Sequence, residues 1–261
     1  MLPNRLQKYL KTPLESDDKY SRGVAGFITG SSAYPGAAIL GVTAAIRTGI
    51  GMVRYQGPDD VQKLVLEARP EVVVQPGRVN AWVIGSGVSP VESERFLSAF
   101  ADDNPKIIDA GALEVFEELG GSAILTPHAG EAAALVSRLD VPIDRKTVDG
   151  DPETVALRLA VLTGQTVCLK GNITIIANPH GEVVSVGPNP ADLATAGTGD
   201  VLAGIMGALL AAHVDDFDAL DIAQTAVLIH AEAARRLATE GPIAALELAD
   251  AVRHVVADWR N

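Results

Sequence analysis

The chain has 261 residues, 48% of them hydrophobic, and its 21 basic and 33 acidic residues give a formal charge of −12. This balance excludes an extended surface for nucleic acid or for an anionic membrane, because such surfaces need clustered Lys and Arg. The single cysteine, Cys168, cannot form an intramolecular disulfide, and residues 1–15 lack the apolar core of a secretory signal. We therefore expect a cytoplasmic protein.

The first half of the chain alternates short apolar segments with helical patterns. Residues 1–22 are polar and are expected to form an N-terminal arm. The strands we expect are 24–29, 52–55, 71–75, 81–84, 106–108 and 122–125, and the helices are 36–48, 58–68, 90–101, 112–119 and 130–138. Repeated strand–helix units predict a mostly parallel sheet with helices on both faces.

The rhythm changes in the second half. A polar loop at 139–151 and a helix at 152–163 precede three short strands, at 166–169, 173–177 and 183–186. The sequence Asn178-Pro179-His180-Gly181 fits a type I turn between the last two, so we expect an antiparallel edge on the sheet. Helices at about 199–212, 218–238 and 246–258 complete the pattern. No linker or repeat divides residues 1–261, which predicts a single α/β domain.

The strongest local signal is a glycine-rich loop that leads directly into an apolar helix. Gly197, Thr198 and Gly199 can expose backbone amides at the positive end of the helix, which suits a phosphate. Asp200 follows, and a carboxylate beside a phosphate is useful if it takes a proton or holds a metal, so it is a candidate general base. The alternative is that Thr198 or Asp200 merely caps the helix.

This loop and three further segments, in the same order, resemble the ADP- or ATP-dependent NAD(P)H-hydrate dehydratases of the ribokinase-like superfamily. The segments are GPNPADLATAGTGDVLAG at 187–204, YPGAAIL at 34–40 with RTGIGMV at 47–53, LTPHAGE at 125–131 and LKGNIT at 169–174. The resemblance covers about residues 17–240. It implies a ribokinase-like fold and a repair reaction that dehydrates damaged, hydrated NADH or NADPH at the expense of a nucleotide.

The resemblance also implies roles for individual residues. Asp200 is the expected catalytic base, and Gly197, Thr198 and Gly199 form the expected anion hole for the transferred phosphate. Substrate contacts are expected from Ala37, Gly87, His128 and Asp200. The residues expected to bind the adenine nucleotide are Lys170, Gly171, Asn172, Ile173, Thr174 and Gly199.

The remaining expectations concern the metal, the assembly and the ligands. The resemblance implies that Glu131 binds Mg²⁺. It also implies that ADP is preferred to ATP as the co-substrate and that the protein forms a homotetramer. The partners are therefore small molecules, with no nucleic acid and no membrane. Plainer interpretations exist: Lys170 could be an ordinary residue of a sheet edge, and His128 and Glu131 could simply begin a helix.

The chain departs from the family pattern at three places near the expected substrate pocket. Gly111 stands where aspartate is common, GSGVS at 85–89 replaces a more usual glycine-proline-glycine-leucine-glycine run, and GPNPAD at 187–192 is looser than the usual Gly-Asn-Pro-Gly. The changes at Gly111 and Ser89 keep open the alternative of a catalytically silent nucleotide-binding protein. The other alternative is a small-molecule kinase of the superfamily, of the hydroxyethylthiazole kinase or sugar kinase type, which would share the Gly-Thr-Gly-Asp loop and Asp200. Asp109 ends a strand and can face the same cleft, whereas His213, His230 and His254 receive no role.

Overall fold

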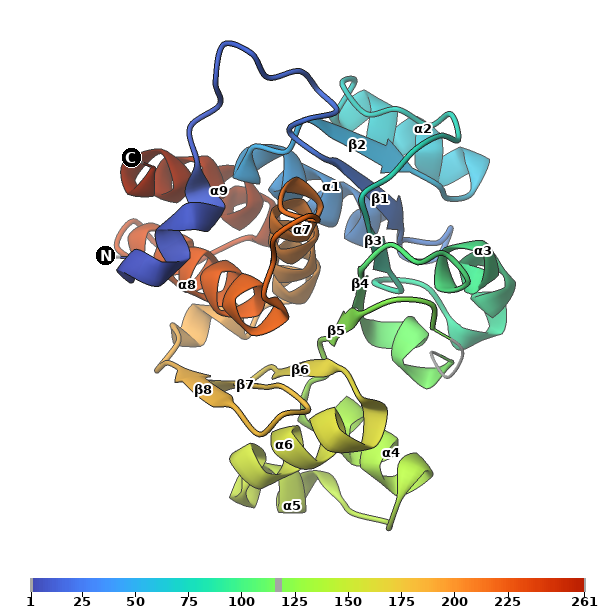
Figure 1. Cartoon of the computed structure of the whole chain (residues 1–261), viewed down its shortest axis with the longest axis vertical. Coiled ribbons are helices and arrows are strands. Elements are labelled where there is room, and N and C mark those ends of the chain that lie inside the picture. Colours follow the sequence, from blue (N-terminus) through green and yellow to red (C-terminus); the bar gives the residue numbers. More distant parts are fainter. Residues whose placement is uncertain (1, 116–118, 261) are drawn as a thin grey trace.

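A single eight-stranded sheet forms the centre of the molecule (Figure 1). The computed structural model describes residues 2–115 and 119–260. The spatial order of the strands is β2-β1-β3-β4-β5-β6-β7-β8, parallel from β2 to β6 and antiparallel for β7 and β8. The strands are β1 (Val24–Ile28), β2 (Met52–Tyr55), β3 (Ala81–Ile84), β4 (Lys106–Ile108), β5 (Ala123–Leu125), β6 (Thr166–Leu169), β7 (Thr174–Ala177) and β8 (Val183–Val186). The predicted parallel sheet with an antiparallel edge is confirmed.

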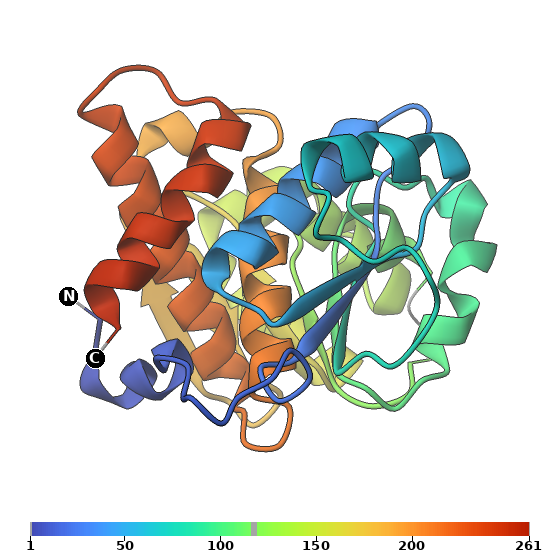
Figure 2. The ribbon, with the colours of Figure 1, turned by 90° about the horizontal axis from the view of Figure 1, so that it is seen from above.

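Helices cover both faces of the sheet, and each face has its own apolar core (Figure 2). Successive strand residues point to opposite faces, so Val83 joins one core and Ile84 the other. The first core takes side chains from α1 (Pro35–Thr48), α2 (Asp59–Ala68), α7 (Thr198–Ala212), α8 (Ala219–Ala238) and α9 (Ala245–Trp259). The second takes them from the 3₁₀ helices η2 (Pro90–Phe96) and η3 (Ala110–Glu114) and from α3 (Leu97–Phe100), α4 (Ala129–Leu139), α5 (Arg145–Gly150) and α6 (Pro152–Thr163).

The backbones of α1 and α7 touch where two glycines meet. A Cβ atom on Gly204 would lie 2.2 Å from the carbonyl oxygen of Gly41, so only hydrogen fits between the helices. Such close contact fixes the two helices against each other. It therefore also fixes the position of the glycine-rich loop at the start of α7 relative to the start of α1.

Four expected elements differ in the structure. Residues 71–75 form no strand and contribute one isolated bridge, from Val73 to Arg54, because Pro70 and Pro76 on either side cannot donate to a ladder. The expected helix 90–101 is mostly 3₁₀, and that at 112–119 is the short turn η3, with residues 116–118 outside the described part of the chain. The expected loop 139–151 contains α5, which Asp144 caps by accepting from the amide of Thr147.

The N-terminal arm is ordered against the C-terminal helices. Its residues Asn4–Leu10 form a 3₁₀ helix, η1, that buries Leu6, Tyr9 and Leu10. A second 3₁₀ turn, η4 (Ala191–Leu193), precedes the glycine-rich loop. Within residues 2–115 and 119–260, no helix is both long and apolar enough to cross a membrane.

Candidate active site

The glycine-rich loop gives α7 an N-terminus whose amides are open. Gly197 has φ +91°, a left-handed conformation that favours glycine, and a Cβ there would lie 2.5 Å from Cδ1 of Leu40. Thr198 donates its hydroxyl backwards to the carbonyls of Leu193 and Thr195, at 2.8 and 3.0 Å. Neither Thr198 nor Asp200 accepts from an amide of the helix in the described residues, so the capping interpretation fails. The open amides suit an anion.

Asp200 lies in the first turn of α7 and is partly buried. Burial raises the pKa of its carboxyl to about 7, the neighbouring Asp109 adds to the rise, and Lys170 opposes it. The helix N-terminus would favour a charged carboxylate, but withdrawal from water and a second acid outweigh that benefit here. A carboxyl that titrates near neutral pH can accept a proton and release it again, as a general base must.

Asp109 follows β4 and accepts hydrogen bonds from three side chains. It accepts hydrogen bonds from Ser86 Oγ at 2.8 Å, Thr126 Oγ1 at 2.7 Å and Lys170 Nζ at 2.7 Å, and it is 3% exposed. Burial alone would raise the pKa of Asp109, but Lys170 and the two hydroxyls together lower it. Asp109 therefore stays ionised beside Asp200.

Lys170 lies between the acids and the anion loop. Burial disfavours its charge, but Asp109 and Glu131 outweigh burial and raise its pKa. Its Nζ lies 4.0 Å from Glu131 Oε2 and 3.8 Å from the position of a Cβ on Gly199. The structure thus places a charged ammonium next to the start of α7, so the interpretation of Lys170 as an ordinary edge residue does not hold.

A cavity of about 460 Å³ opens from Lys170 along the connection between β6 and β7, the segment after β8 and the first turn of α7. Its size lies in the range of small-molecule sites. Five of the expected nucleotide residues, Lys170, Gly171, Asn172, Thr174 and Gly199, line this cavity together with Thr198 of the expected anion hole. Ile173 instead lines a smaller neighbouring cavity of about 190 Å³ and is 51% exposed.

His128 and Glu131 form a capping box at the start of α4. The Nδ1 atom of His128 accepts from the amides of Gly130 and Glu131 at 3.0 and 3.1 Å, and Glu131 Oε2 accepts from the amide of His128 at 2.7 Å. Both residues therefore do begin a helix, as the plainer interpretation holds. The main chain of Lys170 pairs with this segment, so the cap lies beside the ammonium. Nε2 of His128 lies 3.6 Å from Glu131 Oε1, so both ring nitrogens face groups of the same helix start.

Ala37 and Gly87 lie against each other at the start of α1. A Cβ on Gly87 would lie 2.5 Å from the Cβ of Ala37, and Gly87 has φ +66°. No larger side chain fits at Gly87 without moving α1. The pair leaves bare backbone next to the carboxyl end of β1, where ligands of parallel sheets gather. Their predicted contact with substrate stays a prediction.

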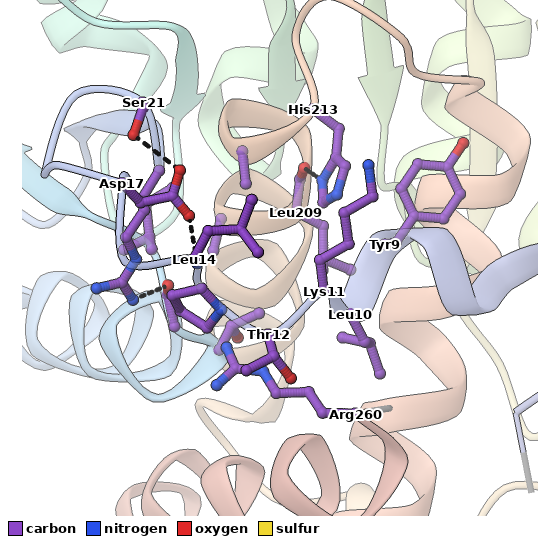
Figure 3. A pocket seen from close by; sticks show the side chains of 17 residues that line it. Tyr9, Leu10, Lys11, Thr12, Leu14, Asp17, Ser21, Leu209, His213 and Arg260 are labelled. Atoms are coloured by element: carbon purple, nitrogen blue, oxygen red, sulfur yellow. Dashed lines mark hydrogen bonds between the residues drawn. The ribbon is translucent and has the colours of Figure 1, made fainter.

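Of two further cavities, one adjoins this cluster at Glu131 and the other lies away from it. One of about 450 Å³ is lined by Val88, Gly111, Glu131 and Arg138 among others, so the departure at Gly111 faces open space. The other, of about 310 Å³, lies between the N-terminal arm and the far end of α7, near Leu209, His213 and Arg260 (Figure 3). It contains none of the expected site residues.

Comparison with known proteins identifies the family to which the chain belongs. The family model described as NAD(P)H-hydrate dehydratase matches residues 25–255. An ADP-dependent (S)-NAD(P)H-hydrate dehydratase of Neisseria meningitidis is 31% identical over 98% of this chain and 91% of its own length. The chain belongs to the NAD(P)H-hydrate dehydratase family.

Two other similar proteins differ in how much of their length this chain covers. A bifunctional NAD(P)H-hydrate repair enzyme of Mycobacterium tuberculosis is 41% identical over 79% of this chain but only 45% of its own length. The chain thus spans about half the length of that relative. The ADP/ATP-dependent NAD(P)H-hydrate dehydratase of Bacillus subtilis, crystallised with ATP and Mg²⁺, superposes with a TM-score of 0.85 at 26% identity and covers 97% of this chain and 96% of that one. The ribokinase-like dehydratase fold is thereby confirmed.

Two residues of the candidate site were not predicted from the sequence. His230 of α8 lies in the wall of the 460 Å³ cavity, with Nε2 2.9 Å from the carbonyl oxygen of Thr198. Asn189 lies in the same wall and donates from Nδ2 to Gly171 O and Thr174 Oγ1, both at 3.1 Å. The only sequence signal for His230 was a polar residue on an otherwise apolar helix face.

Proposed function

We propose that the protein is an ADP-dependent (S)-NAD(P)H-hydrate dehydratase that repairs hydrated NADH and NADPH and releases AMP and phosphate. The observation that carries the proposal is Asp200, a carboxyl with a pKa raised by burial to about 7, at the open N-terminus of α7. Membership of the dehydratase family supports the assignment. In the proposed reaction Asp200 takes the proton of the substrate hydroxyl while that oxygen attacks the terminal phosphorus of ADP.

The surrounding groups supply charge stabilisation and position. The amides at Gly197, Thr198 and Gly199 and the Lys170 ammonium face the oxygens of the transferred phosphoryl group, which carry the developing negative charge. AMP is the first leaving group. Inorganic phosphate then leaves the ring carbon, and the adjacent ring carbon loses a proton to solvent, so that the double bond re-forms. ADP and the hydrate thus give AMP, phosphate and NADH or NADPH, and the hydroxyl proton returns to solvent from Asp200.

The residues present fit a magnesium ion held mainly by the nucleotide. In the described residues no group of three or more His, Cys, Asp or Glu could hold a metal, but Mg²⁺ commonly uses one or two carboxylates with phosphates and water. Glu131 is the proposed carboxylate, since its Oε2 lies 4.0 Å from Lys170 Nζ at the phosphate end. When bound, the ion would neutralise phosphate charge.

The test is a repair assay with purified protein, freshly hydrated NADH and Mg²⁺, with ADP in one arm and ATP in the other. Recovery of the reduced-nicotinamide absorbance that depends on ADP supports the proposal. Recovery with ATP alone would assign the other donor. Nucleotide consumption with a phosphorylated product and no recovery would favour a small-molecule kinase, and nucleotide binding without consumption would favour a silent binder.

Assembly and compartment complete the proposal. We propose a homotetramer in the cytoplasm, on the resemblance to the family and the lack of disulfide chemistry. Light scattering coupled to size-exclusion chromatography measures the assembly directly. A monomer at micromolar concentration would contradict the tetramer and leave the proposed reaction untouched.

A further inference from the structure

His230 presents an unused hydrogen-bond acceptor to the nucleotide cavity. The imidazole is 6% exposed, and its Nε2 lies 2.9 Å from the carbonyl oxygen of Thr198. A carbonyl oxygen only accepts, so Nε2 carries the proton and donates. Because burial lowers the pKa of His230 to about 4, the ring is neutral near pH 7 and Nδ1 is a bare acceptor.

Nδ1 of His230 has no partner among residues 2–115 and 119–260. In the described residues, the side-chain polar atoms that are both fully buried and without a partner belong to Thr29, Arg95, Asn189 and Arg260. Nδ1 of His230 is not one of these atoms, so it is not fully buried. Nδ1 is therefore open to the space outside the protein, and His230 faces that space in the cavity beside Thr198 and Leu202. A ligand group with a hydrogen-bond donor can therefore bind at Nδ1.

The oxygen of Asn189, in the wall of the same cavity, is not available to a ligand. Nδ2 of Asn189 faces the carbonyls of Gly171 and Val186, which fixes the amide orientation. Its Oδ1 is buried and has no donor in the described structure, whereas Nδ1 of His230 is open. Lys170 and the amides of the anion loop offer donors instead of acceptors.

The difference between a bare acceptor and a set of donors determines which part of a nucleotide each can bind. Phosphate oxygens are acceptors and would be repelled by a bare imidazole nitrogen, so they belong at Lys170 and the amides of Gly197–Gly199. A nucleoside carries the complementary donors, namely the ribose hydroxyls and the exocyclic amine of adenine. Leu193, Leu202 and Val227 line the same cavity as His230 and suit an aromatic base.

We propose that Nδ1 of His230 accepts a hydrogen bond from a donor of the nucleoside part of the nucleotide, and that His230 is a binding residue of the site. This inference rests on the proposed function in that the cavity holds an adenine nucleotide. Nε2 of the same ring donates to the carbonyl oxygen of Thr198 at the start of α7. His230 therefore contacts both the nucleoside and the loop that receives the phosphate.

Two substitutions separate the two nitrogens. His230→Gln retains an amide that can donate to Thr198 from about the place of Nε2, but it has no acceptor at Nδ1. His230→Asn retains an oxygen near the place of Nδ1 and loses the bond to Thr198. Calorimetry with ADP is expected to give about fivefold to tenfold weaker binding for His230→Gln, the effect of one hydrogen bond, and a smaller change for His230→Asn.

Nucleotide analogues identify the donor. Wild type is titrated with inosine diphosphate, which lacks the amine, and with the 2′-deoxy and 3′-deoxy forms of ADP. One of the three is expected to bind wild type about as weakly as ADP binds His230→Gln, and that variant is expected not to discriminate it from ADP. Melting temperatures of both variants exclude a folding defect as the cause.

The outcomes separate this inference from the proposed function. If His230→Gln binds ADP as wild type does, or loses affinity equally for ADP and all three analogues, the inference is wrong while the dehydratase proposal stands. If the analogues behave as expected but no hydrated NADH is repaired, the inference stands and the proposed function is wrong. If wild type binds no adenine nucleotide, both are wrong.

Discussion

Two acidic regions meet at the site, and they hold their carboxyls in opposite states. Asp109, at the end of β4, is satisfied by Lys170 and two hydroxyls, and its pKa is lowered despite nearly complete burial. Asp200, at the start of α7, has no such partners, and burial raises its pKa to about 7. The difference teaches that the donors around each acid, rather than the depth of burial, decide which one stays ionised.

This comparison also explains why two acids are useful. The permanent charge on Asp109 keeps Lys170 protonated and orients it toward Gly199. The same charge disfavours a second ionised carboxyl and so raises the pKa of Asp200. One acid thus positions the cation for the phosphate, while the other exchanges the proton.

Asp200→Asn is expected to have the largest effect. The amide cannot accept the substrate proton but preserves the shape of the first turn of α7, so turnover is expected to fall by about 10²- to 10⁴-fold. Binding of ADP is expected to stay within about threefold, because removal of a carboxylate does not remove a donor to phosphate. Steady-state rates and calorimetry on the same preparation check both halves, and unchanged turnover would disprove the role as base.

Asp109→Asn is expected to have the second largest effect. It frees Lys170 from its ion pair, so we expect about a 10- to 100-fold loss of kcat/KM, and a lower pKa for Asp200 because the neighbouring charge is gone. A pH profile of kcat/KM that moves toward lower pH distinguishes this from simple damage. The exposed pair of Asp140 with Arg158 provides a control, since Asp140→Asn is expected to change neither quantity.

The pH profile of the wild type is the next test. As pH falls below the raised pKa of about 7, Asp200 becomes protonated and cannot act as a base. We expect kcat/KM to fall about tenfold per pH unit on the acidic side of that value. ADP affinity measured over the same range separates this limb from a loss of binding. A profile flat down to pH 5 would contradict the raised pKa.

The sequence predicted the parallel part of the fold well because periodicity there reflects burial. Segment 81–84 is apolar throughout and segment 106–108 has two isoleucines after Lys106, and both form central strands. The segment 71–75 has three valines between Glu71 and Gln75 but forms no strand, because Pro70 and Pro76 on either side cannot donate to a ladder. Short 3₁₀ turns such as η3 have no periodicity that a sequence window could detect.

Site residues could be predicted where they are neighbours in the sequence, but not where they come from segments far apart in the chain. The glycine-rich loop and Asp200 are contiguous, so their spacing alone indicated an anion site beside a base. Asp109 could be placed at a strand end, but its contacts with Ser86, Thr126 and Lys170 join four segments far apart in the chain. His230 drew no interpretation, since a single histidine on an apolar helix is informative only once the cavity beside it is seen.

Thr126→Val makes the finest test of the comparison, because it removes one donor from Asp109 and retains the shape of the side chain. Loss of the 2.7 Å bond to this buried carboxylate is expected to cost about 1–2 kcal/mol of unfolding free energy at neutral pH. Because the folded pKa of Asp109 lies below its ordinary value of 3.8, the stability it contributes is present above that value and is lost as pH falls through the folded pKa. The deficit of Thr126→Val should therefore shrink as pH is lowered past about 4, as measured by denaturant unfolding. Turnover should change only about twofold, since Lys170 keeps its partner. A deficit that persists unchanged in acid would mean that Thr126 stabilises the fold by packing, and that Lys170 alone keeps Asp109 ionised.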